Sequence, residues 1–357
     1  MNEMPALAEA FATQSTWCAQ AGAPLYAELL RGMAHNLAQG GIVAALCSGY
    51  EDAPASAVLH IRLLAGLHEI VLAGHAPELE PYYPSVGGQG DRAGVWPVAQ
   101  SVLTEHADRV RAWLDVVPQT NEVGRSVGLA VGLVTAVAMT GRRRVRLLQP
   151  GASAGLHLLV DDYWIEGQGW AWGPSWSPVR MPGAVTGTLP MMPAGVIDDL
   201  SRVVNIVERR GCDVAPVDVR TAAGRRRLQA FIWPEAQVRH ERLAEALEIA
   251  QADPPVVDRA DAADWLEQQL SRPADDDVVT VVWSSITLQY LDKGARQRIS
   301  ALIARARDRM PVVQVGLESS GSHYLAPPQL ALDGRPIGSS PPHGLPLTLG
   351  PVGTLGR

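Results

Sequence analysis

The chain has 357 residues, of which 47% are hydrophobic, and a formal net charge of −7 at pH 7. This length is enough for a large core and predicts one domain with a substantial elaboration. The negative charge argues against nucleic acid as a partner, and we expect no membrane span because no apolar run approaches the roughly 20 residues that one needs. Three widely spaced cysteines without a C-x-x-C pair (Cys18, Cys47 and Cys212) predict a reducing, cytoplasmic environment and neither disulfides nor a zinc site.

The first part of the chain carries apolar residues at helical spacing, interrupted by glycine and proline. Two loops, 81–88 and 118–126, contain proline, glycine and polar residues and separate these segments. The expected helices cover 4–21, 24–37, 55–73, 96–116 and 127–140. We therefore predict an α-helical N-terminal cap over residues 1–140, which serves as a substrate domain.

After residue 141 the pattern changes to short apolar strands that alternate with helical segments, which is typical of a parallel sheet. The first strand begins at Val145, and the further expected strands are 203–213, 255–257, 278–283 and 311–317. The tail from Gln329 predicts a closing antiparallel hairpin. We therefore predict an α/β, Rossmann-like domain over residues 141–357 with a mostly parallel sheet.

Tryptophan is concentrated in one segment that interrupts this alternation. Four of the ten tryptophans, Trp164, Trp170, Trp172 and Trp176, lie within thirteen residues. Glycine and proline are also frequent there, so we expect an insertion over 163–200. It is either a loop packed on itself or an aromatic wall over a ligand.

A glycine turn follows the first predicted strand, in the sequence Gln149-Pro150-Gly151-Ala152-Ser153-Ala154-Gly155. Glycine lets the backbone turn sharply and approach a ligand, and a following helix would offer free N–H groups. This pattern is typical of the first βα unit of a nucleotide-binding sheet, and predicts cofactor contacts by Gln149, Gly151, Ser153 and Gly155. The same residues also form G-x-S-x-G, the nucleophile elbow of α/β-hydrolases.

Polar residues at the ends of the later strands favour the cofactor interpretation. Asp213 closes the second strand, where a carboxylate bonds ribose hydroxyls, and Asp261-Ala262 follows the third, where an acid can accept from an adenine amino group. Ser284 follows the strongest predicted strand. The alternative for both aspartates is a helix cap.

The hydrolase interpretation requires Ser153 as nucleophile, then an acid and a histidine further along the chain. His343 has the appropriate position, and His323 is a second option. This interpretation leaves Asp213 and Asp261 without a role. His157, two residues after the turn, is more typical of a helix-face histidine than of a base.

The loop before the sheet combines Asn121, Glu122 and Arg125. These residues either form a capping network for the next helix or contact a ligand: Arg125 or Asn121 a carboxylate, and Glu122 an ammonium group. Tyr82, Tyr290 and Trp164 are aromatic candidates for a contact with a positively charged group of a ligand, because aromatic ring faces attract cations.

From Val145 to Leu349 the chain resembles class I S-adenosylmethionine-dependent methyltransferases, and nearly end to end it resembles the DUF2332 family. In the methyltransferase pattern an acid is usual at Gln149 and a glycine at Ser153. The segments that carry the DUF2332 resemblance are Gln14-x5-Gln20 with Trp17-Cys18, 82–88, 119–126, 151–158, Trp172-Gly173 with 177–179, 208–213, Trp233-Pro234, Ser284 with 289–291, and His343-Gly344.

The resemblance implies S-adenosylmethionine as cofactor and nucleophilic attack on a carbon attached to its sulfonium. The outcome is either methyl transfer to a small molecule or cyclisation of the cofactor's aminobutyrate arm, as in azetidine-2-carboxylate synthases. Glu122 and Tyr290 are the candidate catalytic residues, because cyclisation needs a proton acceptor close to the amine. A cofactor sensor without turnover is the non-enzymatic alternative.

Overall fold

The computed structural model describes residues 4–54, 57–89, 92–191, 199–272, 274–319 and 326–350. Contacts divide the chain into two compact units. The helical unit comprises Met1–Thr120 and Thr221–Glu241, and the sheet unit comprises Asn121–Arg220 and Arg242–Arg357. The expected boundary at residue 140 therefore lies elsewhere, and each unit draws on two parts of the sequence.

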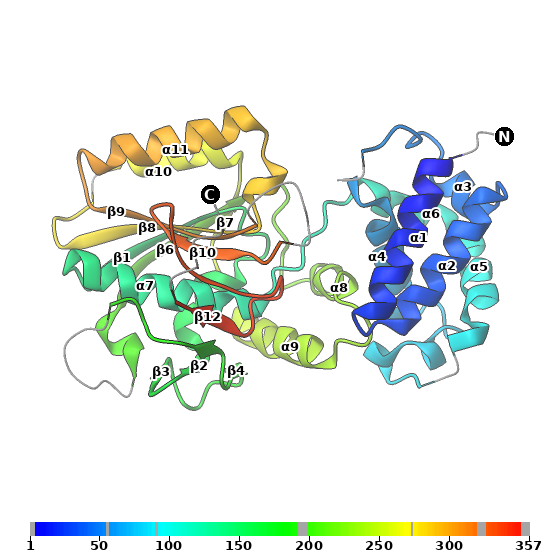
Figure 1. The fold of residues 1–357 in the computed structure, drawn as a ribbon, viewed down its shortest axis with the longest axis horizontal. Helices are drawn as coiled ribbons and strands as arrows, with labels where there is room; N and C mark the ends of the chain where they lie inside the picture. The colour runs from blue at the N-terminus through cyan, green and yellow to red at the C-terminus, as the bar shows by residue number, and fades with distance from the viewer. Residues whose placement is uncertain are drawn as a thin grey trace. The chain divides into compact units, whose positions relative to one another are not determined.

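The helical unit contains short helices around one apolar core (Figure 1). They are α1 (Pro5–Gln20), α2 (Pro24–Ala38), α3 (Ile42–Leu46), α4 (Leu59–Leu72), α5 (Val95–Glu105), α6 (Ala107–Ala112) and α8 (Ala222–Ala230), with 3-10 turns η2 (Glu80–Tyr82), η3 (Pro84–Val86), η4 (Arg92–Gly94) and η5 (Trp113–Asp115). Proline in the first turn begins α1 and α2, where its missing N–H costs nothing. The expected helix 96–116 is divided into α5, α6 and η5.

The sheet unit is built on a nine-stranded sheet in the order β5-β12-β11-β10-β9-β8-β1-β6-β7. The strands are β1 (Arg144–Pro150), β5 (Val185–Thr186), β6 (Asn205–Asp213), β7 (Val257–Arg259), β8 (Val278–Ser285), β9 (Val312–Glu318), β10 (Gln329–Leu332), β11 (Arg335–Ser339) and β12 (Leu347–Leu349). The five strands β7-β6-β1-β8-β9 are parallel. The mixed α/β class with a large, mostly parallel sheet is thus confirmed.

The order of these parallel strands reverses at β1. The chain runs from β1 to β6 and β7 on one side, and then crosses to β8 and β9 on the other. In open α/β sheets, ligands bind at such a switch point, beyond the carboxyl ends of the strands.

The C-terminal strands form more than the expected hairpin. β10, β11 and β12 continue antiparallel from β9, and β5 then pairs parallel with β12.

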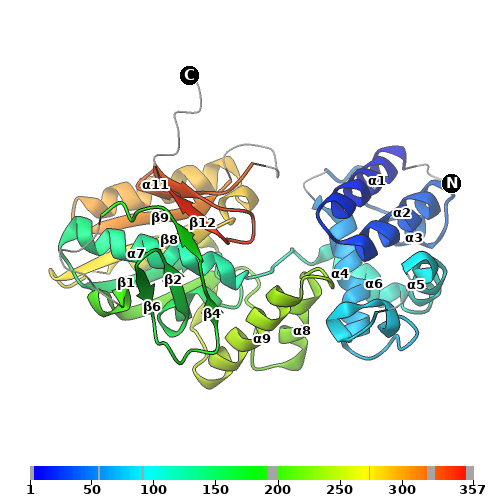
Figure 2. The ribbon, with the colours of Figure 1, turned by 60° about the horizontal axis from the view of Figure 1, so that its bottom comes forward.

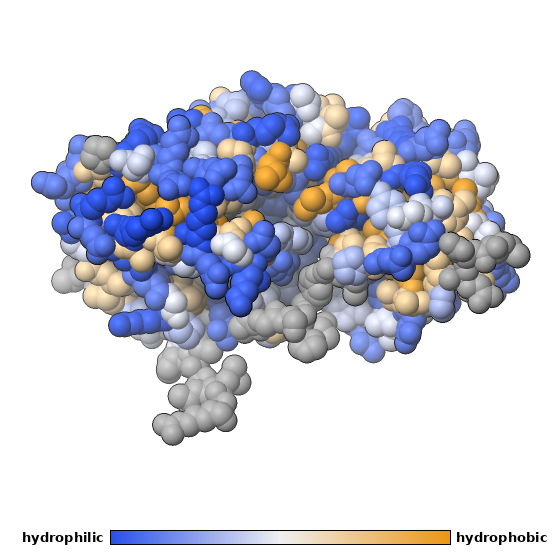
Figure 3. Space-filling model, turned by 90° about the horizontal axis from the view of Figure 1, so that it is seen from above, coloured by the Kyte–Doolittle hydropathy of each residue, from blue (hydrophilic) through white to orange (hydrophobic). Residues whose placement is uncertain are grey.

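Helices cover both faces of the sheet. Figure 1 shows α10 (Ala262–Ser271) and α11 (Lys293–Arg307) on one side and α7 (Ser126–Thr140) on the other. The inward sides of α10 and α11 share a core with β1 and β8, and their outward surface is mostly hydrophilic (Figure 3).

α7 was expected in the cap but packs on the sheet. A Cβ on Gly132 would lie 2.4 Å from Val315 Cγ1 of β9, so glycine permits this close approach. Within the described residues, Val123–Thr140 is long and apolar enough to cross a bilayer, but 78% of that window is buried inside the protein. A helix in the core of a soluble protein is also apolar on all sides, so this composition alone does not indicate a membrane span.

Residues 221–241, expected in the Rossmann-like domain, belong to the helical unit for a comparable reason. Phe231 packs on Trp113 with ring centroids 5.4 Å apart, and Arg226 pairs with the buried Glu69 of α4. The expected break at Trp233-Pro234 separates α8 from α9 (Gln237–Ala252).

The tryptophan-rich insertion forms a second, three-stranded sheet of β2 (Trp164–Gly167), β3 (Trp170–Trp172) and β4 (Arg180–Met181) (Figure 2). A 3-10 turn, η8 (Leu200–Val203), leads into β6. The buried indole of Trp172 donates to the Val160 carbonyl at 2.8 Å, whereas Trp176 is 78% exposed. The segment therefore has its own small sheet and also bonds to residues outside the insertion, at Val160 and through the pairing of β5 with β12.

Candidate functional site

The glycine turn leaves β1 at the switch point, with three residues in the left-handed region. The φ angles of Gly151, Ser153 and Gly155 are 70°, 55° and 76°. A Cβ on Gly151 would lie 2.3 Å from Thr287 Cγ2, and one on Gly155 would lie 2.8 Å from Val257 Cγ2. These glycines allow the turn to pack against the segments after β8 and at β7.

The expected α-helix does not follow this turn. Leu156–Asp162 forms a seven-residue 3-10 segment, η7, with non-helical dihedrals at Leu159. The α-helical N-terminus that was expected to offer free N–H groups to a ligand is therefore not part of this site.

Asp213, at the end of β6, holds the glycine turn. Its Oδ2 accepts from the Ser153 N–H at 2.8 Å, and its Oδ1 accepts from the Ala215 N–H at 2.9 Å. Backbone hydrogen bonds also join the turn to the end of β6 and the segment after it. The Ala152 N–H donates to the Cys212 carbonyl, and the Val217 N–H donates to the Ser153 carbonyl. Contact of Asp213 with a ribose stays a prediction.

Asp261 is the N-cap of α10. Its Oδ1 accepts from the N–H groups of Ala263 at 2.8 Å and Asp264 at 3.1 Å, and Ala262 is the buried first residue of the helix. The capping alternative is therefore present, and a contact with adenine stays a prediction.

The loop before α7 supports the turn through polar contacts. Asn121, in the left-handed region at φ 40°, accepts from the Leu156 N–H at 3.0 Å through Oδ1. Arg125 donates from Nε to the Pro342 carbonyl at 2.9 Å. Neither contact caps the next helix, because α7 has no side-chain cap; instead Glu122 accepts from the Gly124 N–H at 3.5 Å at the start of η6 (Val123–Arg125).

Glu122 is a buried acid in the same loop. Its Oε1 lies 3.9 Å from an Arg242 nitrogen, and its Oε2 lies 3.9 Å from His343 Nδ1. The carboxylate thus faces one permanent cation and one titratable group.

His157 links β1, β8 and the Glu122 loop. Its Nε2 donates to the Glu122 carbonyl at 2.9 Å, so Nδ1 is the acceptor for Gln149 Nε2 and Trp283 Nε1, both at 3.2 Å. Burial lowers the pKa of His157 to about 4. The ring is neutral near pH 7 and joins the elements rather than serving as a base.

Besides the Ser284 hydroxyl, which faces the Glu318 carboxylate, three buried polar atoms at this edge have no hydrogen-bond partner among the described residues. They are Gln149 Oε1, Ser153 Oγ and Ser285 Oγ, from the end of β1, its turn and the end of β8. Buried polar atoms in proteins are almost always bonded, so each exception needs an explanation. Their common position at the switch point indicates a ligand site.

Glu318, which ends β9 beside Ser284, was not among the residues expected at the site. Its carboxylate accepts from the Thr287 N–H at 3.1 Å and the Leu288 N–H at 3.3 Å. Burial raises the pKa of Glu318 to about 7, while these bonds and the Ser284 hydroxyl oppose the shift. The available signal was an acid directly after the predicted strand 311–317, at the same edge as Ser284.

The three aromatic residues predicted to contact a ligand lie in different parts of the chain. Trp164 lies in the small sheet, with the Arg180 guanidinium 3.9 Å above its ring. Tyr290 closes η9 (Leu288–Tyr290) and is 50% exposed. Tyr82 belongs to the helical unit.

The hydrolase interpretation requires a histidine bonded to the Ser153 hydroxyl, and no histidine among the described residues makes this bond. The Ser153 hydroxyl has no partner in the described part of the chain, and His343 lies near Glu122. His323 lies outside the described residues.

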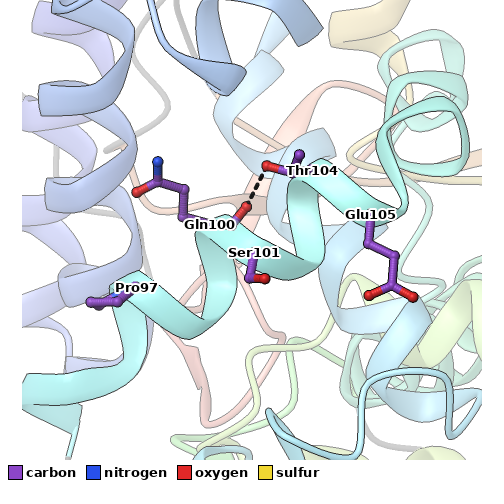
Figure 4. A pocket seen from close by; sticks show the side chains of 5 residues that line it. All are labelled: Pro97, Gln100, Ser101, Thr104 and Glu105. Carbon is purple, nitrogen blue, oxygen red and sulfur yellow. Dashed lines mark hydrogen bonds between the residues drawn. The ribbon is translucent and has the colours of Figure 1, made fainter.

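We also considered a surface cavity and possible metal-binding clusters elsewhere in the chain. A surface cavity of the helical unit lies along α5, lined by Pro97, Gln100, Ser101, Thr104 and Glu105 (Figure 4). Across the ranges that the structure describes, no three His, Cys, Asp or Glu side chains are placed to hold a metal ion.

The fold and this edge define a mixed α/β protein with a candidate site at the carboxyl ends of its central parallel strands. The chain belongs to the DUF2332 family, whose model, described as an uncharacterized protein conserved in bacteria, matches residues 8–347. Comparison with curated proteins gave no match, and neither did comparison with solved structures.

Proposed function

We propose that the protein is an enzyme that uses S-adenosylmethionine, bound at the carboxyl edge around β1. The observation that carries this proposal is the group of unpartnered polar atoms on Gln149, Ser153 and Ser285. An unsatisfied buried polar atom costs about 1–3 kcal/mol, so three of them at one switch point favour a polar ligand that completes their bonds. An adenosyl compound carries the hydroxyl, amine and carboxylate groups for this.

The residues fit such a ligand in their donor and acceptor chemistry. A carboxylate oxygen can accept two hydrogen bonds, so Asp213 has capacity for a ribose hydroxyl in addition to the turn. Gln149 offers a neutral oxygen where the methyltransferase pattern usually has an acid. Ser284 and Ser285 add hydroxyls at the end of β8.

The sulfonium supplies a carbon that is open to displacement. Catalysis of such a displacement is mainly positioning in a suitable electrostatic environment. For cyclisation, the amine must be neutral: a new N–C bond forms, the C–S bond breaks with its electron pair on sulfur, and one proton leaves the nitrogen. Glu122 and Tyr290 stay our candidate catalytic residues, and Glu318 is a third proton acceptor because its pKa is raised to about 7.

To test this proposal, the purified protein is incubated with S-adenosylmethionine alone, and the products are identified by mass spectrometry. Methylthioadenosine together with a cyclic amino acid supports cyclisation, and S-adenosylhomocysteine formed only with an added acceptor supports methyl transfer. Binding without either product leaves the sensor alternative. Absence of binding by calorimetry contradicts the proposal.

One observation favours a second candidate, a hydrolase. Ser153 occupies a left-handed position in a G-x-S-x-G turn after a strand, as a nucleophile elbow requires. Hydrolysis of p-nitrophenyl acetate that disappears in Ser153→Ala, without adenosyl binding, would establish this alternative.

A further inference from the structure

The helical unit contains a second polar cluster, between α2, α4, η3 and the segment after α8. His68, fully buried, is its centre. Its Nδ1 donates to the Ala230 carbonyl at 3.2 Å, and its Nε2 lies 2.8 Å from Ser85 Oγ. Burial lowers the pKa of His68 to about 3, so the ring is neutral near pH 7.

Two polar atoms of this cluster have no hydrogen-bond partner among the described residues. The Tyr83 hydroxyl is completely buried, and its ring lies 5.3 Å from that of His68. Glu235 uses Oε1 to accept from the Leu25 N–H at 2.7 Å, but its Oε2 is buried and unpartnered. Burial raises the pKa of Tyr83 far above its usual value, and the nearby Glu235 contributes to this shift.

Aromatic rings are grouped in the same part of the helical unit. Trp233 lies 5.2 Å from Trp17 and 6.5 Å from Tyr26, measured between ring centroids. Burial raises the pKa of the Glu235 carboxyl, while backbone N–H groups of Leu25, Glu235 and Tyr26 and the positive charge of Arg92 oppose this shift. A carboxylate attracts a cation, and ring faces attract positive charge, so this cluster favours a cationic ligand over an anionic one.

From these contacts we infer that the helical unit binds a small primary ammonium group, with Glu235 Oε2 and Tyr83 Oη as its hydrogen-bond acceptors. An ammonium carries three N–H donors and supplies what both atoms lack. The site is independent of the proposed adenosyl site, since all its residues belong to the helical unit.

Saturation-transfer NMR on the full chain tests this site, with methylammonium as the probe and methanol as the neutral match. We expect saturable transfer to methylammonium and not to methanol. Because hydrogen bonds to a charged group are strong, Glu235→Gln and Tyr83→Phe should each weaken the affinity about tenfold or more. Both variants keep the shape of the side chain, and Glu235→Gln keeps an acceptor for Leu25.

The matched controls are Glu9→Gln and Tyr50→Phe, at exposed and partly exposed positions of the same unit, and they should leave the affinity unchanged. Circular dichroism checks that each variant is folded. If either Glu235→Gln or Tyr83→Phe is unfolded, the affinity of the other variant tests the inference. Absence of saturable transfer, equal transfer to methanol, or unchanged affinity in a folded variant would overturn the inference. So would a high-resolution structure in saturating methylammonium with only a water between Tyr83 and Glu235.

Discussion

The carboxylate of Asp213 accepts a hydrogen bond from the backbone N–H of Ser153, 2.8 Å away and 60 residues earlier in the chain. The bond joins the end of β6 to the turn after β1, so the most prominent acid of the site also shapes the glycine turn. Any ligand contact made by Asp213 depends on this arrangement.

Removal of the Asp213 acceptors should destabilise the sheet unit. We expect a loss in the free energy of unfolding of about 1 kcal/mol for Asp213→Asn and about 3 kcal/mol for Asp213→Ala, because buried N–H groups lose their acceptors. Hydrogen exchange at the amides of β1 measures this effect. Asp264→Asn, which affects only an exposed pair with Arg298, is the control and should change stability by less than about 1 kcal/mol.

Gly151→Ala should lower the free energy of unfolding more than Gly141→Ala does, although both glycines have the same backbone conformation. Gly151 and Gly141 have similar φ angles of 70° and 68°, but only a Cβ on Gly151 meets another residue, Thr287. Gly141→Ala should therefore cost about 1 kcal/mol, and Gly151→Ala about 2 kcal/mol more. Adding Thr287→Ser, which removes Cγ2, should recover part of the difference in urea unfolding; no recovery would contradict the packing explanation.

The buried His157 makes stability depend on pH. Its folded pKa of about 4 lies below the unfolded value of 6.5, so the unfolded chain binds more protons between these limits. Stability should fall as pH drops from about 6.5 to 4, by about 3 kcal/mol from this group. His157→Gln should reduce this pH dependence, measured by urea unfolding at pH 7 and pH 5. His60 and His68, with pKa values lowered to about 4 and about 3, contribute in the same direction and should retain their share.

Glu318 should give stability the opposite pH dependence, with a loss of stability as the pH rises. Its folded pKa of about 7 lies above the usual 4.5, so the folded state binds more protons between these values and stability is lost as pH rises through 7. Glu318→Gln should therefore be more stable, relative to the native protein, at pH 8 than at pH 5. An identical difference at both pH values would show that the carboxyl titrates normally, and a ¹³C-carboxyl titration by NMR checks this directly.

Substitution of the unpartnered serines should change the affinity for the ligand without lowering the stability of the protein. Ser285→Ala and Ser153→Ala remove hydroxyls without partners, so stability should be unchanged or slightly higher, while affinity for S-adenosylmethionine falls about tenfold. Ser177→Ala, whose hydroxyl donates to the Asp162 carbonyl at 2.6 Å, should lose about 1 kcal/mol of stability and no affinity. Lower stability of Ser285→Ala without an effect on binding would contradict the ligand site.

Local sequence patterns were sufficient for most elements, because they report neighbours within a few residues. The hairpin expected from Gln329 begins there as β10, and the helix expected from Pro24 begins there as α2. The aspartate at the cap of α10 was also recognisable as an alternative, since capping involves only the next three residues.

Long-range packing decided the rest. The sequence by itself determined an α/β chain with a helical N-terminal part, a glycine turn and polar residues at strand ends. Only the tertiary structure assigned α7 to the sheet, bonded Asp213 to Ser153, and brought Glu318 beside Ser284. The physical reason is that these contacts depend on which strands are neighbours and on how closely backbones approach, and residues 30 to 180 positions apart leave no periodic trace of either.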